Sequence, residues 1–307
     1  MIGAEISVLM SVYNGQPYLP MAVESILQQT YKNFEFIIIN DGSTDDSLDY
    51  LKSLKDERIR LFDQENKGLG AALNFGLGKV RTMFVARMDC DDIAIAHRLE
   101  KQIKKMRSEP ELVMLGTGIA FTLDGHKTAF PPPLPANHKA IHSVLSKGGH
   151  AISHPTIMCK TEILREIGGY RINGVGQDWD LFLRMCEAGK VANLPEVLLY
   201  YRLHESSNAW KSSDKTVMGK KFAVDSAYRR SRGEQELTYE DFIKTYNRPG
   251  GLKTIQRKVL SFSDNAYRVA ILSALKSNYP KMILALSISV MTNPKKLYLY
   301  MKKRFLR

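Results

Sequence analysis

The sequence has few cysteines, no long hydrophobic run and no recognisable secretion signal. Its three cysteines, Cys90, Cys159 and Cys186, are scattered over 307 residues without metal-ligand or redox spacing, which favours a reducing cytosol. The longest apolar candidate, residues 282–291, is shorter than the roughly 20 residues that cross a bilayer. Residues 1–5 lead directly into a strand-like run, without a basic flank or a cleavage site. We therefore expect a cytoplasmic protein without a transmembrane helix.

Positive charge is concentrated in the last third of the chain. The formal net charge is +12, and residues 211–307 hold 21 of the 44 Lys and Arg residues but only 7 of the 32 Asp and Glu residues. The hydrophobic share of 44% and the charged share of 25% are otherwise those of an ordinary globular protein. The basic excess therefore suggests an attachment surface in the C-terminal region.

Apolar β-prone runs alternate with helical segments over the first 106 residues. Strands are predicted at 5–13, 34–40, 59–63 and 82–88, and helices at 18–29, 44–54, 68–80 and 93–106. Alternation at this spacing predicts an α/β fold with a doubly wound, mostly parallel sheet and helices on both faces. Ligands gather at the carboxyl ends of strands in such sheets. Tyr13, Asp41 and Asp89 follow three of these strands, so one crevice can hold all three.

The order is less regular after residue 110. We expect strands at 112–123, 151–160 and 194–203, helices at 138–146, 161–167 and 177–188, and a hairpin turn at Asp124-Gly125. From about residue 214 the chain is predicted to be almost purely helical, with breaks near Gly233, at Pro249-Gly-Gly251, at Pro280 and at Pro294. This pattern predicts two parts, an α/β domain at 1–210 and a basic helical region at 211–307.

Three carboxylates crowd the end of the fourth predicted strand. Asp89, Asp91 and Asp92 follow an apolar run through Val85 and Ala86. Ionised carboxylates so close together repel one another unless a cation lies among them. Asp89 and Asp91 can share a hard divalent cation, which also binds phosphate oxygens. The residues alone leave open a second interpretation, in which Asp91 or Asp92 caps the following helix.

Eight short motifs occur in order along the chain. They are Val-Tyr-Asn-Gly (12–15), Asn-Asp-Gly-Ser-Thr-Asp-Asp-Ser (40–47), Asn-Lys-Gly-Leu-Gly (66–70) with Ala-Leu-Asn-Phe-Gly (72–76), Arg-Met-Asp-Cys-Asp-Asp (87–92), His154-Pro155, Gly168-Gly-Tyr-Arg171, Gln177-Asp-Trp-Asp-Leu181 and Tyr201-Arg-Leu-His204. This series strongly resembles family 2 glycosyltransferases of the bacterial surface-polysaccharide type. Such enzymes have the GT-A fold and transfer sugars from nucleotide diphosphates with inversion. The resemblance covers residues 6 to about 207 and implies that residues 1–210 bind the nucleotide sugar and carry the catalytic site.

On the donor side, the resemblance implies a nucleotide-sugar site formed by Val12, Tyr13, Asp41, Lys67, Arg87 and Asp89. Tyr13 offers an aromatic face on which a base can stack, or it is a tyrosine at the edge of the core. The resemblance implies uracil and ribose contacts for Asp41, with an Asx turn or cap as the alternative. Lys67 either approaches phosphate or base edges or is an exposed lysine. Arg87 either neutralises the acids or a phosphate, or forms a structural ion pair.

For the metal ion, the resemblance implies an Asp-x-Asp motif at Asp89 and Asp91. Asp91 then coordinates Mn²⁺ or Mg²⁺, and Asp89 contacts the ribose, the sugar or the ion. His204 lies where relatives can supply a further metal ligand, and a histidine suits Mn²⁺ better than Mg²⁺. A structural histidine at a strand end is the alternative.

On the acceptor side, inversion requires one displacement and therefore one general base for the acceptor hydroxyl. Asp178 is the predicted base. Many relatives have Glu-Asp where this chain has Gln177-Asp178, and the glutamine removes a charge that would have raised the pKa of Asp178. Asp180 lies about 200° further round the helix and is expected to face elsewhere as a solvated or capping acid. His154 and Trp179 are predicted near the acceptor, with a purely structural role as the alternative.

Residues 293–307 alternate Lys and Arg with Leu, Tyr, Met and Phe. A helix of this composition suits the surface of an anionic bilayer, and packing on the domain is the alternative. No nucleic-acid-binding motif accompanies the tail, so we expect no nucleic-acid partner.

The sequence as a whole predicts a metal-dependent inverting glycosyltransferase, peripheral to the inner face of the cell membrane. Its expected substrates are a UDP-sugar and a glycan or polyprenyl-linked acceptor in surface-polysaccharide biosynthesis. A nucleotidyltransferase would need a Gly-rich, basic triphosphate loop that residues 14–17 do not provide. An inactive relative that binds membrane or glycan as a scaffold remains the non-enzymatic alternative.

Overall fold

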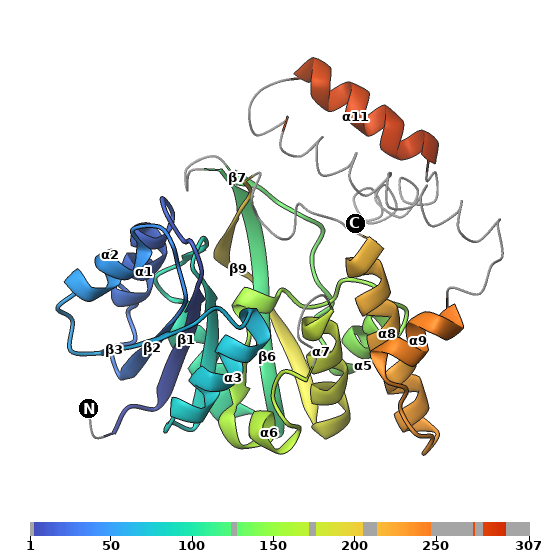
Figure 1. Cartoon of the computed structure of the whole chain (residues 1–307), viewed down its shortest axis with the longest axis horizontal. Helices are drawn as coiled ribbons and strands as arrows, with labels where there is room; N and C mark the ends of the chain where they lie inside the picture. Colours follow the sequence, from blue (N-terminus) through green and yellow to red (C-terminus); the bar gives the residue numbers. More distant parts are fainter. Residues whose placement is uncertain are drawn as a thin grey trace.

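One mixed sheet organises the molecule (Figure 1). The computed structural model describes residues 3–123, 128–171, 176–204, 214–246, 273 and 279–292. The sheet has nine strands in the order β3-β2-β1-β4-β8-β6-β9-β5, with β7 paired to β6. The strands are β1 (Ile6–Val12), β2 (Phe34–Asp41), β3 (Ile59–Gln64), β4 (Phe84–Asp89), β5 (Ile93–Ala94), β6 (Leu112–Thr122), β7 (Thr128–Ala129), β8 (Met158–Lys160) and β9 (Lys190–Arg202).

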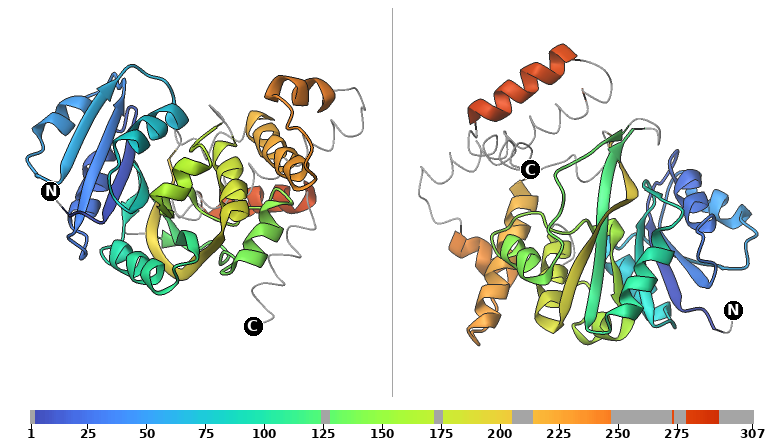
Figure 2. Two further views of the ribbon diagram at one scale, coloured as in Figure 1. Left: turned by 90° about the horizontal axis from the view of Figure 1, so that it is seen from below. Right: turned by 180° about the vertical axis from the view of Figure 1, so that it is seen from behind.

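Helices cover both faces of the sheet (Figures 1 and 2). The helices are α1 (Leu19–Leu27), α2 (Ser47–Ser53), α3 (Leu69–Lys79), α4 (Arg98–Ser108), α5 (His138–Leu145), α6 (Thr161–Glu166), α7 (Gln177–Ala188), α8 (Asp214–Ser231), α9 (Tyr239–Tyr246) and α11 (Tyr279–Thr292), with a 3₁₀ turn at His154–Thr156. Strands β3, β2, β1 and β4 are parallel, as predicted. Strand β8 runs antiparallel to β4 and β6, so the second half of the sheet is mixed.

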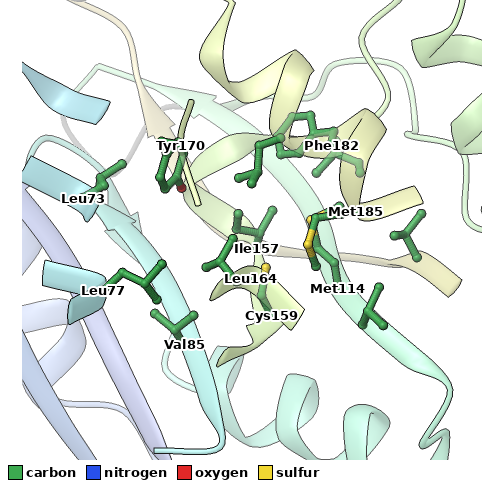
Figure 3. Packing of buried hydrophobic residues seen from close by; sticks show 14 of the residues in the cluster. Leu73, Leu77, Val85, Met114, Ile157, Cys159, Leu164, Tyr170, Phe182 and Met185 are labelled. Carbon is green, nitrogen blue, oxygen red and sulfur yellow. The ribbon is translucent and has the colours of Figure 1, made fainter. Parts of the chain in front are cut away.

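Two apolar clusters, one on each face, hold the layers together. In β1, Ile6, Val8 and Met10 pack with residues of α1, α2 and α4, whereas Leu9 points to the other face. This alternation follows from the two-residue period of a strand, and it explains why β1 and β2 are apolar almost throughout. The cluster around Leu9 joins α3, α5, α6 and α7, and its packing near Tyr170 is shown in Figure 3.

Helix α4 begins five residues later than predicted. Ile93 and Ala94 form β5, which pairs with β9, and the helix starts only at Arg98. The Ala94 N–H donates to Ser25 Oγ and forms no helical hydrogen bond. Tertiary pairing therefore overrides the local helical preference, and Asp92 does not cap this helix.

Helix α2 also begins later than predicted, at Ser47. Two serine side chains of this segment instead hold the loop after β1. Ser43 Oγ accepts from the Asn14 N–H at 3.1 Å, and Ser47 Oγ accepts from the Gly15 N–H at 2.9 Å. The 40–47 motif therefore fixes the loop that carries Tyr13.

The predicted strand at 151–160 is mostly wrong. Pro155 lies in the 3₁₀ turn, and only Met158–Lys160 pair with the sheet, because proline cannot donate to a ladder. Strand β9 begins at Lys190, four residues before its predicted start.

The described C-terminal part is helical, as predicted. Gly233, with φ +68°, lies just beyond α8, whereas Pro280 lies in the first turn of α11, where proline is tolerated, and does not break a helix. The predictions at Asp124-Gly125, at Pro249-Gly-Gly251 and at 293–307 lie outside the described residues. No helix in the described part of the chain combines the length and the apolar character of a membrane-crossing segment.

Candidate active site

The carboxyl ends of β1, β2 and β4 lie at one edge of the sheet. Ser11 is in register with Asp89, and Val12 is in register with Asn40. Tyr13, just beyond β1, is 52% exposed, while the Val12 side chain is fully buried. The structure therefore brings the predicted donor-side residues of these three strands to one edge.

Asp41 organises a loop at this edge. Its side chain is 1% exposed and accepts three hydrogen bonds: from Gln64 Nε2 at 2.7 Å, from the Lys67 N–H at 2.9 Å and from the Gly68 N–H at 2.9 Å. The two backbone N–H groups belong to the residues just before α3, so Asp41 holds the loop that leads into this helix. Its predicted uracil and ribose contacts stay a prediction. The Lys67 side chain is exposed, and it is the backbone of this residue that contacts Asp41.

The three acids after β4 form a cluster that fits a hard cation. Asp89, Asp91 and Asp92 each offer an oxygen within 4.8 Å of the others. Asp92 Oδ1 accepts from the Arg202 N–H at 2.9 Å, and its buried Oδ2 has no hydrogen-bond partner among the described residues. Burial, with repulsion from Asp91, raises the pKa of Asp92. An all-oxygen donor set with an unpaired buried atom suits Mg²⁺ or Mn²⁺.

Basic side chains surround this acid cluster. Buried Arg87 forms an ion pair with Asp89, and its Nε and Nη1 have no hydrogen-bond partner among the described residues. His204 Nε2 lies 2.9 Å from Asp91 Oδ2, and its ring packs on Tyr18. Arg202 Nε donates to the Asp91 carbonyl at 2.8 Å. The turn of the acid cluster is therefore fixed from both β4 and the end of β9.

Asp178 lies in the first turn of α7, far from the acid cluster in the sequence, and the charge of Arg87 acts on it. Burial raises the pKa of this half-buried carboxyl, and the positive charges of Lys220 and Arg87 lower it in part. Gln177 is buried, and its Oε1 has no hydrogen-bond partner in the described part of the chain. A carboxylate with a raised pKa is a stronger base than an ordinary aspartate.

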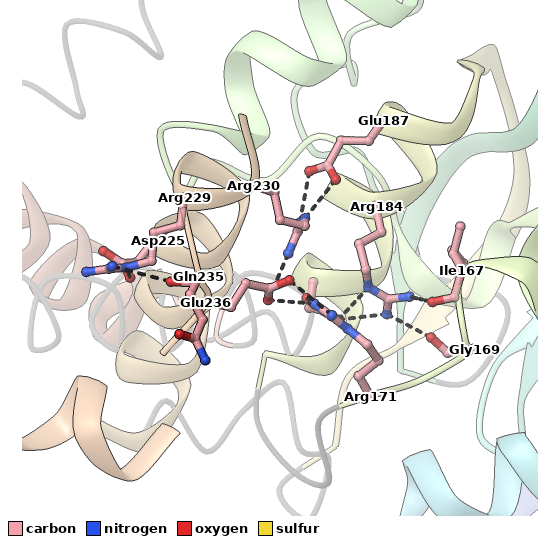
Figure 4. Close-up of polar contacts among 11 residues, drawn as sticks. Ile167, Gly169, Arg171, Arg184, Glu187, Asp225, Arg229, Arg230, Gln235 and Glu236 are labelled. Atoms are coloured by element: carbon pink, nitrogen blue, oxygen red, sulfur yellow. Dashed lines mark hydrogen bonds and ion pairs between the residues drawn. The ribbon is translucent and has the colours of Figure 1, made fainter. Parts of the chain in front are cut away.

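Asp180 faces away from Asp178, as predicted, but it is buried and not solvated. It forms ion pairs with Arg171 at 2.9 Å and with Arg184 at 2.7 Å. Arg184 also donates to the carbonyls of Ile167 and Gly169 (Figure 4). Asp180 was expected to be a solvated or capping acid, because the position of a residue round a helix does not reveal its contact with Arg171.

The predicted acceptor-side residues contact protein groups. His154 Nε2 and the Tyr170 hydroxyl are 2.7 Å apart and share a hydrogen bond. Burial, with the charge of Arg87, lowers the pKa of His154 and keeps its ring neutral. Trp179 is 7% exposed and donates to the Gly149 carbonyl at 3.3 Å. Their roles toward an acceptor stay predictions.

Sequence reasoning missed four contributors to this site. Asp92 was in view as part of the acidic run but was given only a capping role. Tyr170 and Arg202 lie inside the 168–171 and 201–204 motifs, and the motifs did not indicate what they contact. Lys220 lies in no motif, and nothing in the sequence pattern distinguishes it from other lysines of the basic region.

The profile of the family described as Glycosyl transferase family 2 matches residues 7–168. The chain belongs to glycosyltransferase family 2. The chain is 36% identical over 210 residues to the Escherichia coli O-antigen biosynthesis glycosyltransferase WbnJ, covering 66% of this chain and 81% of WbnJ. It is 33% identical over 256 residues to the Bacillus subtilis putative glycosyltransferase EpsE, covering 78% of this chain and 86% of EpsE.

Solved structures show the same fold for this family 2 glycosyltransferase. S. aureus TarS 1–349, crystallised in complex with UDP, aligns with a TM-score of 0.59 at 14% identity, covering 94% of this chain and 88% of TarS 1–349. The predicted GT-A fold class is confirmed by this similarity, and the predicted family and its enzymatic activity are confirmed by the sequence comparisons.

Replacing Asp41 tests its role in the loop at the start of α3. Asp41→Asn places an amide N–H₂ opposite backbone donors, so we expect a loss of about 1–3 kcal/mol in the free energy of unfolding. We also expect nucleotide binding to weaken by at least about tenfold, because the loop loses its anchor. Denaturant titration and isothermal calorimetry measure the two effects. Glu65→Gln, at an exposed acid of the same loop, is the matched control, and equal stability of the two variants would contradict the anchoring role.

Proposed function

We propose that this family 2 enzyme transfers a sugar from a UDP-sugar, with inversion, to an acceptor hydroxyl in surface-polysaccharide biosynthesis. The observation that carries the proposal is the arrangement of two separate acidic groups around Arg87. The acid cluster at Asp89, Asp91 and Asp92 lies at the end of β4, and Asp178 lies at the start of α7. The charge of Arg87 acts on both Asp89 and Asp178.

A UDP-sugar is the donor that the relatives support. TarS 1–349 has been crystallised with UDP and also with UDP-GlcNAc. In this chain the donor would lie at the edge formed by β1, β2 and β4. There the exposed Tyr13 ring is available for stacking on a base, next to the loop that Asp41 anchors.

The acid cluster supplies the ligands for a divalent cation. Asp89 and Asp91 would hold Mn²⁺ or Mg²⁺, with Asp92 and His204 as further contributors, and the bound ion would neutralise the charge of the diphosphate leaving group. Arg87 is buried beside Asp89 and adds a fixed positive charge at this position. His204, 2.9 Å from Asp91, orients that carboxylate or joins the ligand set.

Asp178 is the proposed general base. It would take the proton of the acceptor hydroxyl while that oxygen attacks the anomeric carbon from the side opposite the diphosphate, which inverts the configuration. Neutral His154 is fixed by its hydrogen bond to the Tyr170 hydroxyl and does not supply a second acid at this place. His154 and Trp179 are proposed to shape the acceptor side without proton transfer.

The names of the relatives support an acceptor from cell-surface glycans. WbnJ is named for O-antigen biosynthesis, and AmsE of Erwinia amylovora, 34% identical over 202 residues, is named for amylovoran biosynthesis. A growing glycan or a polyprenyl-linked acceptor fits this class. A scaffold that has lost catalysis is the second candidate, and the intact Asp89, Asp91 and Asp178 speak against it.

We propose that the C-terminal region attaches the enzyme to the inner face of the membrane, with the division between the two parts near residue 210. Helix α11 exposes large apolar side chains: Ile283 is 59% exposed, Leu284 63% and Met291 81%. The surrounding sequence is strongly basic. Exposed apolar groups beside basic residues favour the surface of an anionic bilayer.

Turnover of a donor panel tests the substrate class and the metal. Purified enzyme is assayed for nucleotide release from UDP-, GDP- and dTDP-sugars with a glycan acceptor and with Mn²⁺, Mg²⁺ or EDTA. We expect activity with a UDP-sugar and its loss with EDTA or in Asp91→Asn, because the leaving diphosphate then lacks its counter-charge. Full turnover in EDTA would contradict the metal site, and preference for another nucleotide would contradict the donor.

Replacement of Asp178 tests the base. Asp178→Asn keeps the size of the side chain but cannot accept the proton, so we expect transfer to fall by about 10² to 10⁴-fold with UDP binding retained. In the unmodified enzyme, activity should fall as pH decreases through the raised pKa of Asp178, above the usual aspartate range near 3.9. Turnover assays measure the rate of transfer, and isothermal calorimetry with UDP measures nucleotide binding separately. Transfer by Asp178→Asn at the wild-type rate would exclude this residue as the base.

Vesicle co-sedimentation tests the membrane attachment. We expect the protein to bind vesicles that contain phosphatidylglycerol more strongly than vesicles of phosphatidylcholine alone, and salt to weaken the binding. The double variant Ile283→Glu/Leu284→Glu should lose most of this binding. Met83→Glu, at a side chain 66% exposed next to β4, is the control and should bind as the wild type does. Equal binding of all three proteins would exclude α11 as the attachment element.

A further inference from the structure

Helix α8, which follows the last of the eight family motifs, lies against the start of the catalytic helix α7. Gly176 is the residue before α7 and has φ +90°. A Cβ at Gly176 would lie only 2.4 Å from the backbone carbonyl carbon of Gly219 in α8. No side chain fits between the two backbones, so this glycine contact sets how closely α8 approaches Asp178 two residues further on.

A second contact fixes α8 at the far end of α7. Arg230 of α8 forms an ion pair with Glu187 at 2.7 Å (Figure 4). The spacing from Gly176 to Glu187 in one helix equals that from Gly219 to Arg230 in the other, about three helical turns. The two helices are therefore parallel and in constant register over this length.

Glu236, just beyond α8, connects this pair of helices to the loop before α7. Its carboxylate lies 3.1 Å from Arg230 and 3.0 Å from Arg171. Arg171 in turn pairs with buried Asp180 of α7. The register of α8 on α7 is therefore held at the start, at the end and through the contacts of Arg171 with Glu236 and Asp180.

This register places a lysine next to the proposed base. Lys220 directly follows Gly219, is half-buried, and has its Nζ 4.0 Å from the centre of the Trp179 ring. Trp179 is the residue after Asp178. An ammonium group held on an aromatic face and partly removed from water acts more strongly on a nearby carboxylate than an exposed lysine does.

We propose that Lys220 is a positioning residue for the general base, held by α8 beside Asp178 so that its ammonium favours the ionised carboxylate that accepts the acceptor's proton. The catalytic unit then extends past residue 210 into α8. This inference rests on the proposed role of Asp178 and adds to it a residue from outside the family motifs.

Among the described residues, the other groups that interact with Asp178 are Arg87 and Tyr170, and each keeps its charge state near neutral pH. Arg87 of β4 acts on Asp178 as a permanent cation, and its own pKa is raised by the neighbouring acids despite its burial. The Tyr170 hydroxyl, on the segment before α7, also interacts with Asp178, and burial raises its pKa, so it stays neutral. Gln177 carries no charge. Replacing Lys220 should therefore change mainly the pKa of Asp178.

Loss of the Lys220 charge should raise the pKa of Asp178. Burial raises the pKa of Asp178 and the lysine charge lowers it, so loss of that charge must move the pKa up. The fraction of enzyme with an ionised base then falls at a higher pH than in the wild type. A role of Lys220 in packing alone would reduce stability or rate without moving this limb of the pH profile.

The test is the pH dependence of kcat/KM for wild type, Lys220→Met, Lys220→Gln and Lys220→Arg, with unfolding measured in parallel. We expect the acidic limb to move up by about half to one pH unit in the Met and Gln variants and to return to the wild-type position in the Arg variant. Lys221→Met is the matched control, because Lys221 is the next residue of α8 and donates to the Tyr246 hydroxyl instead. Its acidic limb should coincide with that of the wild type.

Two results would overturn the inference, and they are distinguishable. If Lys220→Met or Lys220→Gln is folded and keeps the wild-type acidic limb while Asp178→Asn has lost transfer, the role of Lys220 is wrong and the base assignment stands. If Asp178→Asn transfers at the wild-type rate, the base assignment fails and the inference about Lys220 fails with it.

Discussion

The concentration of negative charge at the end of β4 is the constraint around which the rest of the structure is arranged. Asp89, Asp91 and Asp92 lie within a few ångströms of one another in a partly buried turn, where their repulsion is weakly screened. Basic and N–H groups from distant parts of the chain offset it. Arg87 comes from β4 itself, whereas Arg202 comes from the end of β9, more than a hundred residues later. The return of β9 across the sheet to pair with β5 is what brings the two together.

Arg87 links the two chemically distinct parts of the site. Its side chain is buried on the same face of the sheet as Tyr170 and His154, and its charge acts on carboxylates at both ends of this region. Burying a guanidinium whose N–H groups lack hydrogen-bond acceptors lowers the stability of the folded protein. In the proposed function, the diphosphate of the sugar nucleotide would bring negative charge on which this guanidinium can act.

The sequence allowed the first half of the fold to be predicted almost element by element. Strands β1 and β2 are apolar on both faces, and the strands β1 to β4 are separated by helices of ordinary length, so the pattern is determined locally. The errors fall where distant pairing decides the structure: Ile93 and Ala94 join β9, and Ser47 holds the loop at Gly15. At the site, the motifs indicated Asp41, Asp89, Asp91 and Asp178 as candidate functional residues, but they did not indicate which groups these side chains contact. The burial of Asp180 was not predicted, because the sequence does not reveal its contact with Arg171. Lys220 was missed because α8 contains none of the family motifs.

The parallel pair of α7 and α8 has a consequence for the order in which the enzyme is completed during synthesis. Every strand of the sheet and the whole of α7 leave the ribosome before α8 does, because α8 follows them in the chain. Until then the start of α7 lacks the neighbour that Gly176 is shaped to receive, and one side of Trp179 remains uncovered. The nascent chain can therefore assemble the edge formed by β1, β2 and β4 first, and the surroundings of Asp178, the proposed base, are finished last.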